Sequence, residues 1–166
     1  PNRLRPHLHL PKSDGTTIYI DLVMIARTGI YVFESKNFSG CIFGDEDSRY
    51  WTQTMKRGPK QQFYNPIWQN ESRISSLKRQ LALEADAFKS YVVFSDQCTL
   101  KKMYVQSGRV KVMNRSMIVR EIIKDMAELP DIFTPLEINQ IYSELVPYTH
   151  TAAAIGQARI ETVRLE

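Results

Sequence analysis

Apolar and polar positions between residues 17 and 36 follow the pattern of a β-hairpin. Residues 17–25 and 30–36 are rich in β-branched and aromatic side chains, and apolar residues occupy successive positions in both segments. Runs of this kind are typical of strands that are covered on both faces of a sheet. A two-residue loop at 27–28 or a four-residue loop at 26–29 would join them. We therefore predict a buried hairpin.

Five shorter runs of the same type predict further strands. They cover residues 7–10, at a sheet edge, 41–44, 50–55, 91–95 and 110–113. Residues 11–15 are expected to form a turn, and residues 55–62, which include Gly58-Pro59, are expected to form a polar loop.

Helical periodicity begins after residue 65. Asn65-Pro66 favours a helix start, because the Asn side chain accepts hydrogen bonds from free N–H groups and Pro fits the first turn. An apolar face then follows at helical spacing and consists of Ile67, Ile74, Leu77, Leu81 and Ala85. This pattern predicts a long amphipathic helix.

The last third of the chain is also helical in pattern. Residues 117–126 predict one helix, and a capping box of Thr134 and Glu137 opens another that Pro147 ends. Residues 149–164 predict a further, polar helix. The order of elements indicates an α/β core over residues 1–115 and a C-terminal helical extension, residues 116–166, that packs on it.

Length and composition agree with one globular domain. The 166 residues are 43% hydrophobic and 24% charged, which excludes a disordered or collagen-like chain. The formal net charge of +4 is a weak tilt towards a polyanionic partner. Cys41 and Cys98 are the only cysteines, which disfavours a disulfide framework or a cysteine-rich zinc site, so we expect a reducing, cytoplasmic location.

Several function classes are disfavoured by missing motifs. No run approaches the roughly 20 apolar residues of a membrane span, and no signal-peptide pattern opens the chain. Phosphate-binding loops, the dinucleotide-binding glycine pattern and the G-x-S-x-G elbow are absent from the sequence. Because the chain begins at Pro1 without Met, we treat it as a fragment whose flanks can hold a helix or an anchor.

Two carboxylates interrupt the predicted hairpin. With either even-length loop, Asp21 lies directly opposite Glu34, with Cβ atoms about 4.5–5.5 Å apart. Lys36 shares their face of the sheet, so the three side chains carry a formal charge of minus one. Like charges at this range repel, and a divalent cation such as Mg²⁺ or Mn²⁺ would relieve the repulsion.

This pattern favours phosphodiester hydrolysis. Asp21, Glu34 and the Ser35 carbonyl can hold the metal, and Lys36 can orient the nucleophile or offset developing negative charge. The plainer interpretation is a salt bridge at a strand end, because Glu-x-Lys recurs by chance in many proteins.

Basic and aromatic side chains interleave between residues 51 and 73. Lys56, Arg57, Lys60 and Arg73 are candidates for contacts with nucleic acid. The accompanying aromatic residues, Trp51, Phe63, Tyr64 and Trp68, can stack on bases, but packing in the core is the better expectation for most of them. Two histidines, His7 and His9, alternate on the first strand, where a third metal ligand is not evident and ordinary hydrogen bonding is favoured over a transition-metal site.

The segments TTIYIDLVMIARTGIYVFESKNFSGCIFG and NPIWQN, with Trp51 between them, resemble the nuclease-related domain (NERD) family. That family is grouped with nucleases of the PD-(D/E)XK fold, in which helices flank a mixed central sheet as in restriction endonucleases. The resemblance covers roughly residues 8–115 and, more loosely, the tail. It implies that Asp21 is the signature Asp, that Glu34 and Lys36 are the E-x-K pair, and that Gln69 is the helix Gln.

The match departs from the family pattern at three places. Ile20 stands where the nominal motif has Pro, and Ser35 replaces the more usual Thr. The family also has a Gly-Glu pair on a helix before the first strand, and the chain begins too late to contain it.

Together, these features predict a metal-dependent nuclease that hydrolyses DNA phosphodiesters, with RNA as an alternative substrate. The catalytic residues would be Asp21, Glu34, Lys36 and Gln69. The competing hypothesis is a nuclease-fold module that binds nucleic acid or a protein partner without cutting.

Overall fold

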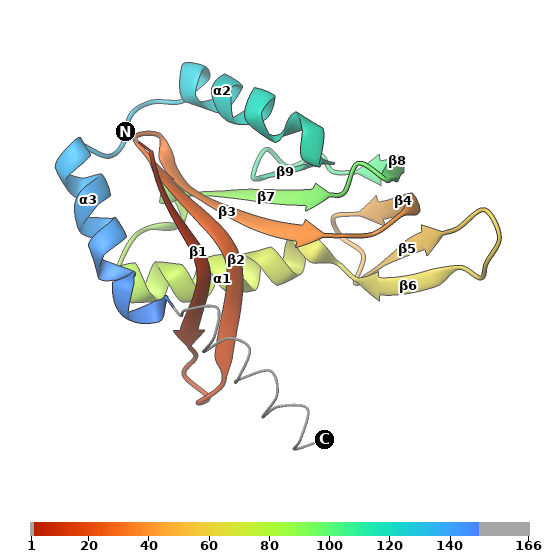
Figure 1. The fold of residues 1–166 in the computed structure, drawn as a ribbon, viewed down its shortest axis with the longest axis horizontal. Coiled ribbons are helices and arrows are strands. Elements are labelled where there is room, and N and C mark those ends of the chain that lie inside the picture. Colours follow the sequence, from red (N-terminus) through yellow and green to blue (C-terminus); the bar gives the residue numbers. More distant parts are fainter. Residues whose placement is uncertain (1, 150–166) are drawn as a thin grey trace.

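The computed structural model describes residues 2–149 as two mixed β-sheets and three α-helices (Figure 1). The larger sheet has the strand order β1-β2-β3-β7-β9 and the smaller sheet β6-β5-β4-β8. Short 3₁₀ turns cover Ala85–Ala87, Arg115–Met117 and Val146–Tyr148. The α/β fold predicted for the chain is confirmed, and it agrees with a nuclease-like architecture.

The larger sheet is built on the predicted hairpin. Its strands are β1 (Arg3–Pro11), β2 (Thr17–Ala26), β3 (Gly29–Lys36), β7 (Phe88–Phe94) and β9 (Val110–Asn114). The first three run antiparallel, and β7 and β9 lie parallel to β3. The predicted edge strand is therefore real and longer than residues 7–10.

The hairpin turn is the two-residue loop. Ala26 pairs with Gly29, and the register continues without a shift to Leu22 and Phe33. Gly29 has φ +151°, and a Cβ there would lie 2.9 Å from the Ala87 carbonyl oxygen. Glycine is thus required where β3 starts beside the chain that leads into β7.

The two faces of the larger sheet pack against different helices. Helices α1 (Pro66–Leu81) and α3 (Pro135–Glu144) cover one face, and α2 (Ile118–Glu128) covers the other (Figure 1). The face towards α1 carries Val23, Ile25, Ile30 and Val32, and the face towards α2 carries Met24, Tyr31 and Phe33. This alternation explains why both hairpin strands are apolar at successive positions.

The helix starts follow the predicted caps. The Asn65 side chain accepts a 2.9 Å hydrogen bond from the Ile67 N–H, and Thr134 and Glu137 make the capping box. The apolar face of α1 ends sooner than predicted, because Ala82 adopts a left-handed conformation and Ala85 begins a separate 3₁₀ turn. The helix predicted at 149–164 lies outside the described residues.

The smaller sheet contains two strands that the sequence pattern missed. Its members are β4 (Gly40–Asp45), β5 (Tyr50–Thr54), β6 (Gln61–Tyr64) and β8 (Cys98–Tyr104). The missed strands β6 and β8 form the two edges of this sheet and expose many polar side chains, so neither presents an apolar run. The prediction of a loop over residues 55–62 is therefore wrong for residues 61 and 62, which begin β6.

One face of the smaller sheet is apolar. Trp51 is 1% exposed and packs with Ile42, Phe63 and Phe94. Gly44 lies beneath the indole, since a Cβ there would come within 2.4 Å of the Trp51 ring. Core packing is thus confirmed for Trp51 and Phe63.

Between residues 2 and 149 no helix is long and apolar enough to cross a bilayer. Cys41 and Cys98 are free thiols.

Candidate active site

The predicted carboxylates lie at one end of the larger sheet, on the face that α1 covers. The pairing of β2 with β3 ends at Leu22 and Phe33, which are the chain neighbours of Asp21 and Glu34. Asp21 is half-buried, and its negative charge acts on the Glu34 carboxyl. The two carboxylates thus lie just beyond the paired part of the hairpin, and their direct opposition stays a prediction.

Glu34 is a buried carboxylate with two cationic partners. It is 4% exposed, its Oε1 lies 3.3 Å from the Lys36 Nζ, and its Oε2 accepts a hydrogen bond from the Arg73 guanidinium. Burial raises the pKa of Glu34 above the ordinary value; the Arg73 and Lys36 charges oppose this rise, and Asp21 adds to it. Because the Glu34 carboxylate is buried, water does little to weaken its electrostatic interactions with the neighbouring charges.

Arg73 ties α1 to both strands of the hairpin. Its Nε donates a 2.7 Å hydrogen bond to the Tyr19 carbonyl on β2, while its Nη1 donates to Glu34 on β3. Sequence reasoning assigned Arg73 to nucleic-acid contacts; the structure instead brings its side chain, 19% exposed, into the carboxylate site. The available signal was its position one helical turn after Gln69, on the same side of the helix.

Arg73 also changes the charge balance of the site. Asp21 and Glu34 contribute two negative charges, and Lys36 and Arg73 contribute two positive charges. The trio of Asp21, Glu34 and Lys36 carries minus one as predicted, and Arg73, which the prediction did not include, brings the cluster to zero. The carboxylates are neutralised by side chains of the chain itself, so charge repulsion alone does not demand a metal.

Two amides of α1 approach the same region. Asn70 is fully buried and donates from Nδ2 to the Val32 carbonyl at 2.9 Å and to the Ser90 hydroxyl at 2.8 Å. The Gln69 Oε1 and Asn70 Oδ1 atoms are buried without a hydrogen-bond partner among the described residues. Leaving a buried amide oxygen unsatisfied costs about 1–3 kcal/mol. Gln69 thus has an acceptor to offer to a water or ligand.

The donor set fits a hard divalent cation. The Lys36 carbonyl accepts a 3.0 Å bond from the Ser95 N–H beyond β7, and successive carbonyls of a strand point to opposite sides. The Ser35 carbonyl accordingly points towards β2, the strand that carries Asp21. Two carboxylates, one carbonyl and several waters are a typical Mg²⁺ environment. Within residues 2–149 no group of three or more His, Cys, Asp or Glu side chains could hold a metal, so protein carboxylates would supply at most two ligands.

The histidines of β1 pack around Tyr19 on the neighbouring strand. His7 hydrogen-bonds to the Tyr19 hydroxyl, and the His9 ring meets the Tyr19 ring edge-on, with centroids 5.0 Å apart. This arrangement agrees with the ordinary hydrogen-bonding role expected for them.

The basic candidates other than Arg73 lie together on one loop. Lys56, Arg57 and Lys60 are exposed between β5 and β6. The base of this loop contacts the link that follows Lys36, because Gln53 Nε2 donates a 2.8 Å bond to the Ser39 carbonyl. The loop therefore starts close to the end of β3 on which Glu34 and Lys36 lie.

A second acid–lysine cluster, which the sequence reasoning missed, lies on the opposite face of the larger sheet. Lys111 Nζ is 2.7 Å from Asp125 and 2.9 Å from Glu121, and the Tyr91 hydroxyl donates a 2.5 Å bond to Asp125. Burial, followed by the hydrogen bond to Asp125, raises the pKa of Tyr91 far above its ordinary value. Lys111 on β9 bridges both acids of α2, and Tyr91 ties the same helix to β7, so we assign this cluster to structure.

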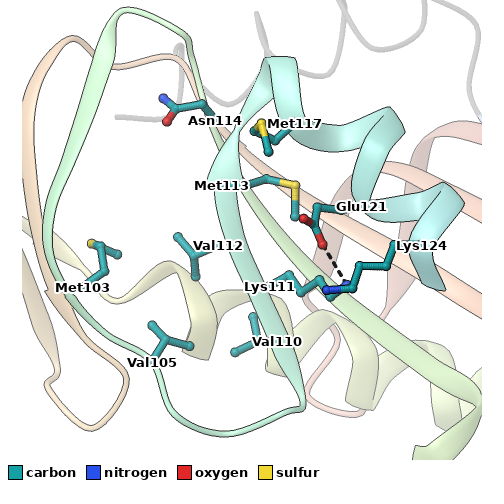
Figure 2. A pocket seen from close by; sticks show the side chains of 10 residues that line it. All are labelled: Met103, Val105, Val110, Lys111, Val112, Met113, Asn114, Met117, Glu121 and Lys124. Atoms are coloured by element: carbon teal, nitrogen blue, oxygen red, sulfur yellow. Dashed lines mark hydrogen bonds and ion pairs between the residues drawn. The ribbon is translucent and has the colours of Figure 1, made fainter. Parts of the chain in front are cut away.

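A cavity of about 480 Å³ adjoins this cluster (Figure 2). Figure 2 shows the Lys111–Glu121 ion pair at one side, with the apolar side chains of β8 and β9 opposite. Met103 belongs to β8, Val110 and Val112 belong to β9, and Val105, which also lines the cavity, directly follows β8. The cavity lies on the side of β9, away from the Asp21–Glu34 site.

Comparison with known proteins agrees with this architecture. The family model for the nuclease-related domain matches residues 3–95, more than half of the chain. An uncharacterized protein of Bacillus anthracis is 35% identical over 99 residues, which cover 60% of this chain and 46% of that protein. The chain thus spans less than half the length of that relative. No solved structure matches the chain described here. On the strength of the matched segment and the mixed α/β architecture, the chain belongs to the nuclease-related domain family, whose general fold class is PD-(D/E)XK.

Proposed function

We propose that this domain is a metal-dependent nuclease that hydrolyses phosphodiester bonds of DNA. The observation that carries the proposal is the buried Glu34 carboxylate, which lies within range of the Asp21 charge and 3.3 Å from the Lys36 ammonium. Family membership supports a nuclease-related role.

Each side chain has a distinct task in this proposal. Asp21 and Glu34, with the Ser35 carbonyl, hold Mg²⁺ or Mn²⁺. When bound, the ion polarises a phosphoryl oxygen and lowers the pKa of a bound water. Lys36 offsets negative charge at the phosphate, and the unsatisfied Gln69 oxygen accepts a hydrogen bond from the attacking water.

Arg73 acts through Glu34. Burial favours the protonated carboxyl, whereas the guanidinium favours the carboxylate that a metal needs. Because Arg73 is also anchored to the Tyr19 carbonyl, it holds Glu34 at a defined distance from β2. It is a positioning residue, and it does not contact the phosphate.

The loop between β5 and β6 supplies the contacts to the polymer. Lys56, Arg57 and Lys60 are exposed and close to the end of β3, so they can neutralise backbone phosphates on either side of the cleaved bond. Such contacts position a strand without reading its sequence.

A second candidate function is binding without cleavage. The charge balance of the site favours it, because Lys36 and Arg73 neutralise both carboxylates in the absence of a metal. In that case the same cations would hold the fold together and the basic loop would remain a binding surface.

Supercoiled plasmid distinguishes the two functions. With Mg²⁺ or Mn²⁺ we expect nicked and linear DNA, no cleavage in EDTA, and a loss of about 100-fold or more in Asp21→Asn and Lys36→Ala, as for removal of groups that stabilise transition-state charge. Lys124→Ala, an exposed lysine of α2, is the matched control and should cut normally. Because contaminating nucleases would cut in every preparation, equal cleavage by wild type and both site variants would reject the proposal.

A further inference from the structure

The smaller sheet has one face that the described residues leave open. Along β5, Trp51 points inward to the core, so Tyr50, Thr52 and Thr54 point outward. Tyr64 on β6 pairs with Tyr50, and Phe43 on β4 pairs with Thr52. We call this surface the outer face of the smaller sheet.

Exposed tyrosines form a row across one end of the outer face. Tyr104 on β8 pairs with Asp45 on β4, and Tyr50 on β5 pairs with Tyr64 on β6. The two pairs are neighbours, because the indole of Trp51, next to Tyr50, donates a 2.9 Å hydrogen bond to the Asp45 carbonyl. Tyr104 is 57% exposed, Tyr50 51% and Tyr64 39%. Several large aromatic side chains that lie side by side on neighbouring strands and are exposed to solvent are unusual on a surface that binds no partner.

Neighbouring side chains contact the rings of Tyr50 and Tyr64. The Tyr50 and Tyr64 centroids are 6.4 Å apart at an interplanar angle of 83°, and Trp68 packs 6.0 Å from Tyr64. The Arg49 guanidinium lies 5.6 Å from the Tyr50 centroid. Ring contacts on both sides restrict how Tyr64 can move, which lowers the entropy lost on binding.

Charge on this part of the chain suits a polyanion. Residues 40–64 and 98–104 contain six lysines and arginines and three acids, so they hold most of the net charge of +4. The cations are Arg49, Lys56, Arg57, Lys60, Lys101 and Lys102. Of the acids, Asp45 accepts from the Asp47 N–H, and Glu46 accepts from the backbone of Gln106 and Ser107. Two acids are thus held by nearby backbone groups, whereas the cations of the β5–β6 loop are exposed.

We infer that the outer face of the smaller sheet binds single-stranded nucleic acid, with bases stacked on Tyr50, Tyr64 and Tyr104. Arg49 beside this row and the cations of the β5–β6 loop, at the opposite end of the same hairpin, hold the backbone. Aromatic side chains on an open sheet and adjacent cations are the two elements of sequence-tolerant single-strand binding. A duplex buries its base faces and cannot use the tyrosines. The inference rests on the proposed function in that it names the strand state of the substrate, and it is tested by binding alone.

The test is fluorescence anisotropy in EDTA, with a labelled 15-nucleotide dT strand, the matching rU strand and a dT·dA duplex of the same length. Wild type should bind the single strands at least about tenfold more tightly than the duplex, and each of Tyr50→Ala, Tyr64→Ala and Tyr104→Ala should lose about tenfold in affinity for single strands. The corresponding Tyr→Phe variants keep the ring and should lose less than about twofold. Val119→Ala, which removes an exposed apolar side chain of α2, should bind as wild type does.

Three results would overturn the inference: tyrosine-to-alanine variants that bind normally, a duplex bound as tightly as the single strands, or no binding of any oligonucleotide. Far-UV circular dichroism on each variant separates loss of binding from loss of fold. Failure of plasmid cleavage with intact oligonucleotide binding would reject the nuclease proposal alone, and the reverse result would reject the stacking surface alone. Comparison of dT with rU shows whether the sugar matters.

Discussion

The two sheets of this domain are similar in topology and opposite in exposure. Both contain parallel and antiparallel neighbours, but helices cover the larger sheet on both faces, whereas the smaller sheet buries one face and presents the other to solvent. Glu34 of the larger sheet is therefore buried and paired with Lys36 and Arg73. The lysines and arginines of the smaller sheet and of its β5–β6 loop are exposed to solvent, which suits contacts with a partner.

This difference decides what a charge can do in each region. Around Glu34, water is excluded and each neighbouring charge has a strong effect on the carboxyl. At Lys56 and Lys60, water and salt screen the charge, so these residues act at long range on a polyanion and contribute little to stability. A covered sheet can hold reactive groups, and an open sheet can present binding groups.

We expect the largest effect on stability when the buried Arg73–Glu34 ion pair is broken. Arg73→Gln leaves Glu34 buried with Lys36 as its remaining cation, and we expect the free energy of unfolding to fall by about 2–3 kcal/mol, somewhat less than for a fully buried pair. Urea denaturation measures it. The control is Arg27→Gln, which breaks the exposed Arg27–Asp131 pair and should cost less than about 1 kcal/mol. Equal losses in the two variants would remove the distinction between the regions.

A smaller effect concerns pH. Because burial raises the pKa of Glu34, the folded protein binds this proton more tightly than the unfolded chain does. The contribution of Glu34 to stability is therefore fully present below its unfolded pKa and is lost as the pH rises through its folded pKa. Urea denaturation of wild type and Glu34→Gln between pH 4 and 8 should show this slope in wild type only.

Asp14 provides the control of opposite sign. The Thr16 hydroxyl and N–H bind its carboxylate in an exposed turn and hold the pKa of Asp14 below its ordinary value. Its contribution is present above the unfolded pKa and is lost as the pH falls. If the Glu34 slope had the same sign as that of Asp14, the cations rather than burial would control the site.

The smallest effect on stability is expected for the basic loop. Lys56→Gln, Arg57→Gln and Lys60→Gln should each leave the free energy of unfolding within about 0.5 kcal/mol of wild type. Each should also reduce the salt slope of nucleic-acid binding by about one, as expected for a phosphate contact. Anisotropy titrations at several salt concentrations provide the slopes, with Lys124→Gln on α2 as the control. Unchanged slopes would remove this loop from the binding surface.

Much of the larger sheet could be predicted because its signals are local. The apolar hairpin, the Asn65-Pro66 start and the Thr134 capping box each depend on a few neighbouring residues, and the structure confirms them. Strands β6 and β8 could not be found in the same way, since they are edge strands whose outward side chains are polar. Strand β6 pairs with β5, which directly precedes it, whereas β8 pairs with β4 from a distant part of the chain.

In the candidate site, too, local features could be predicted and contacts between distant segments could not. Asp21, Glu34 and Lys36 could be brought together from the sequence, because a two-residue turn fixes the hairpin register. Arg73 was assigned to another role, since nothing in helical spacing says which strand a side chain reaches. Its contact with Glu34 brings the formal charge of the cluster from minus one to zero.

By itself, the sequence determined the short-range features: where several strands and helices start, which strand faces are apolar, and the hairpin turn that brings two carboxylates to one end of the sheet. Only the tertiary structure decided which cations neutralise those carboxylates and which tyrosines remain in water. Those outcomes depend on how α1 lies over β2 and β3, and on the absence of a described helix over the outer face of the smaller sheet. Electrostatic balance and burial are set by contacts between distant segments, and short-range patterns do not specify such contacts.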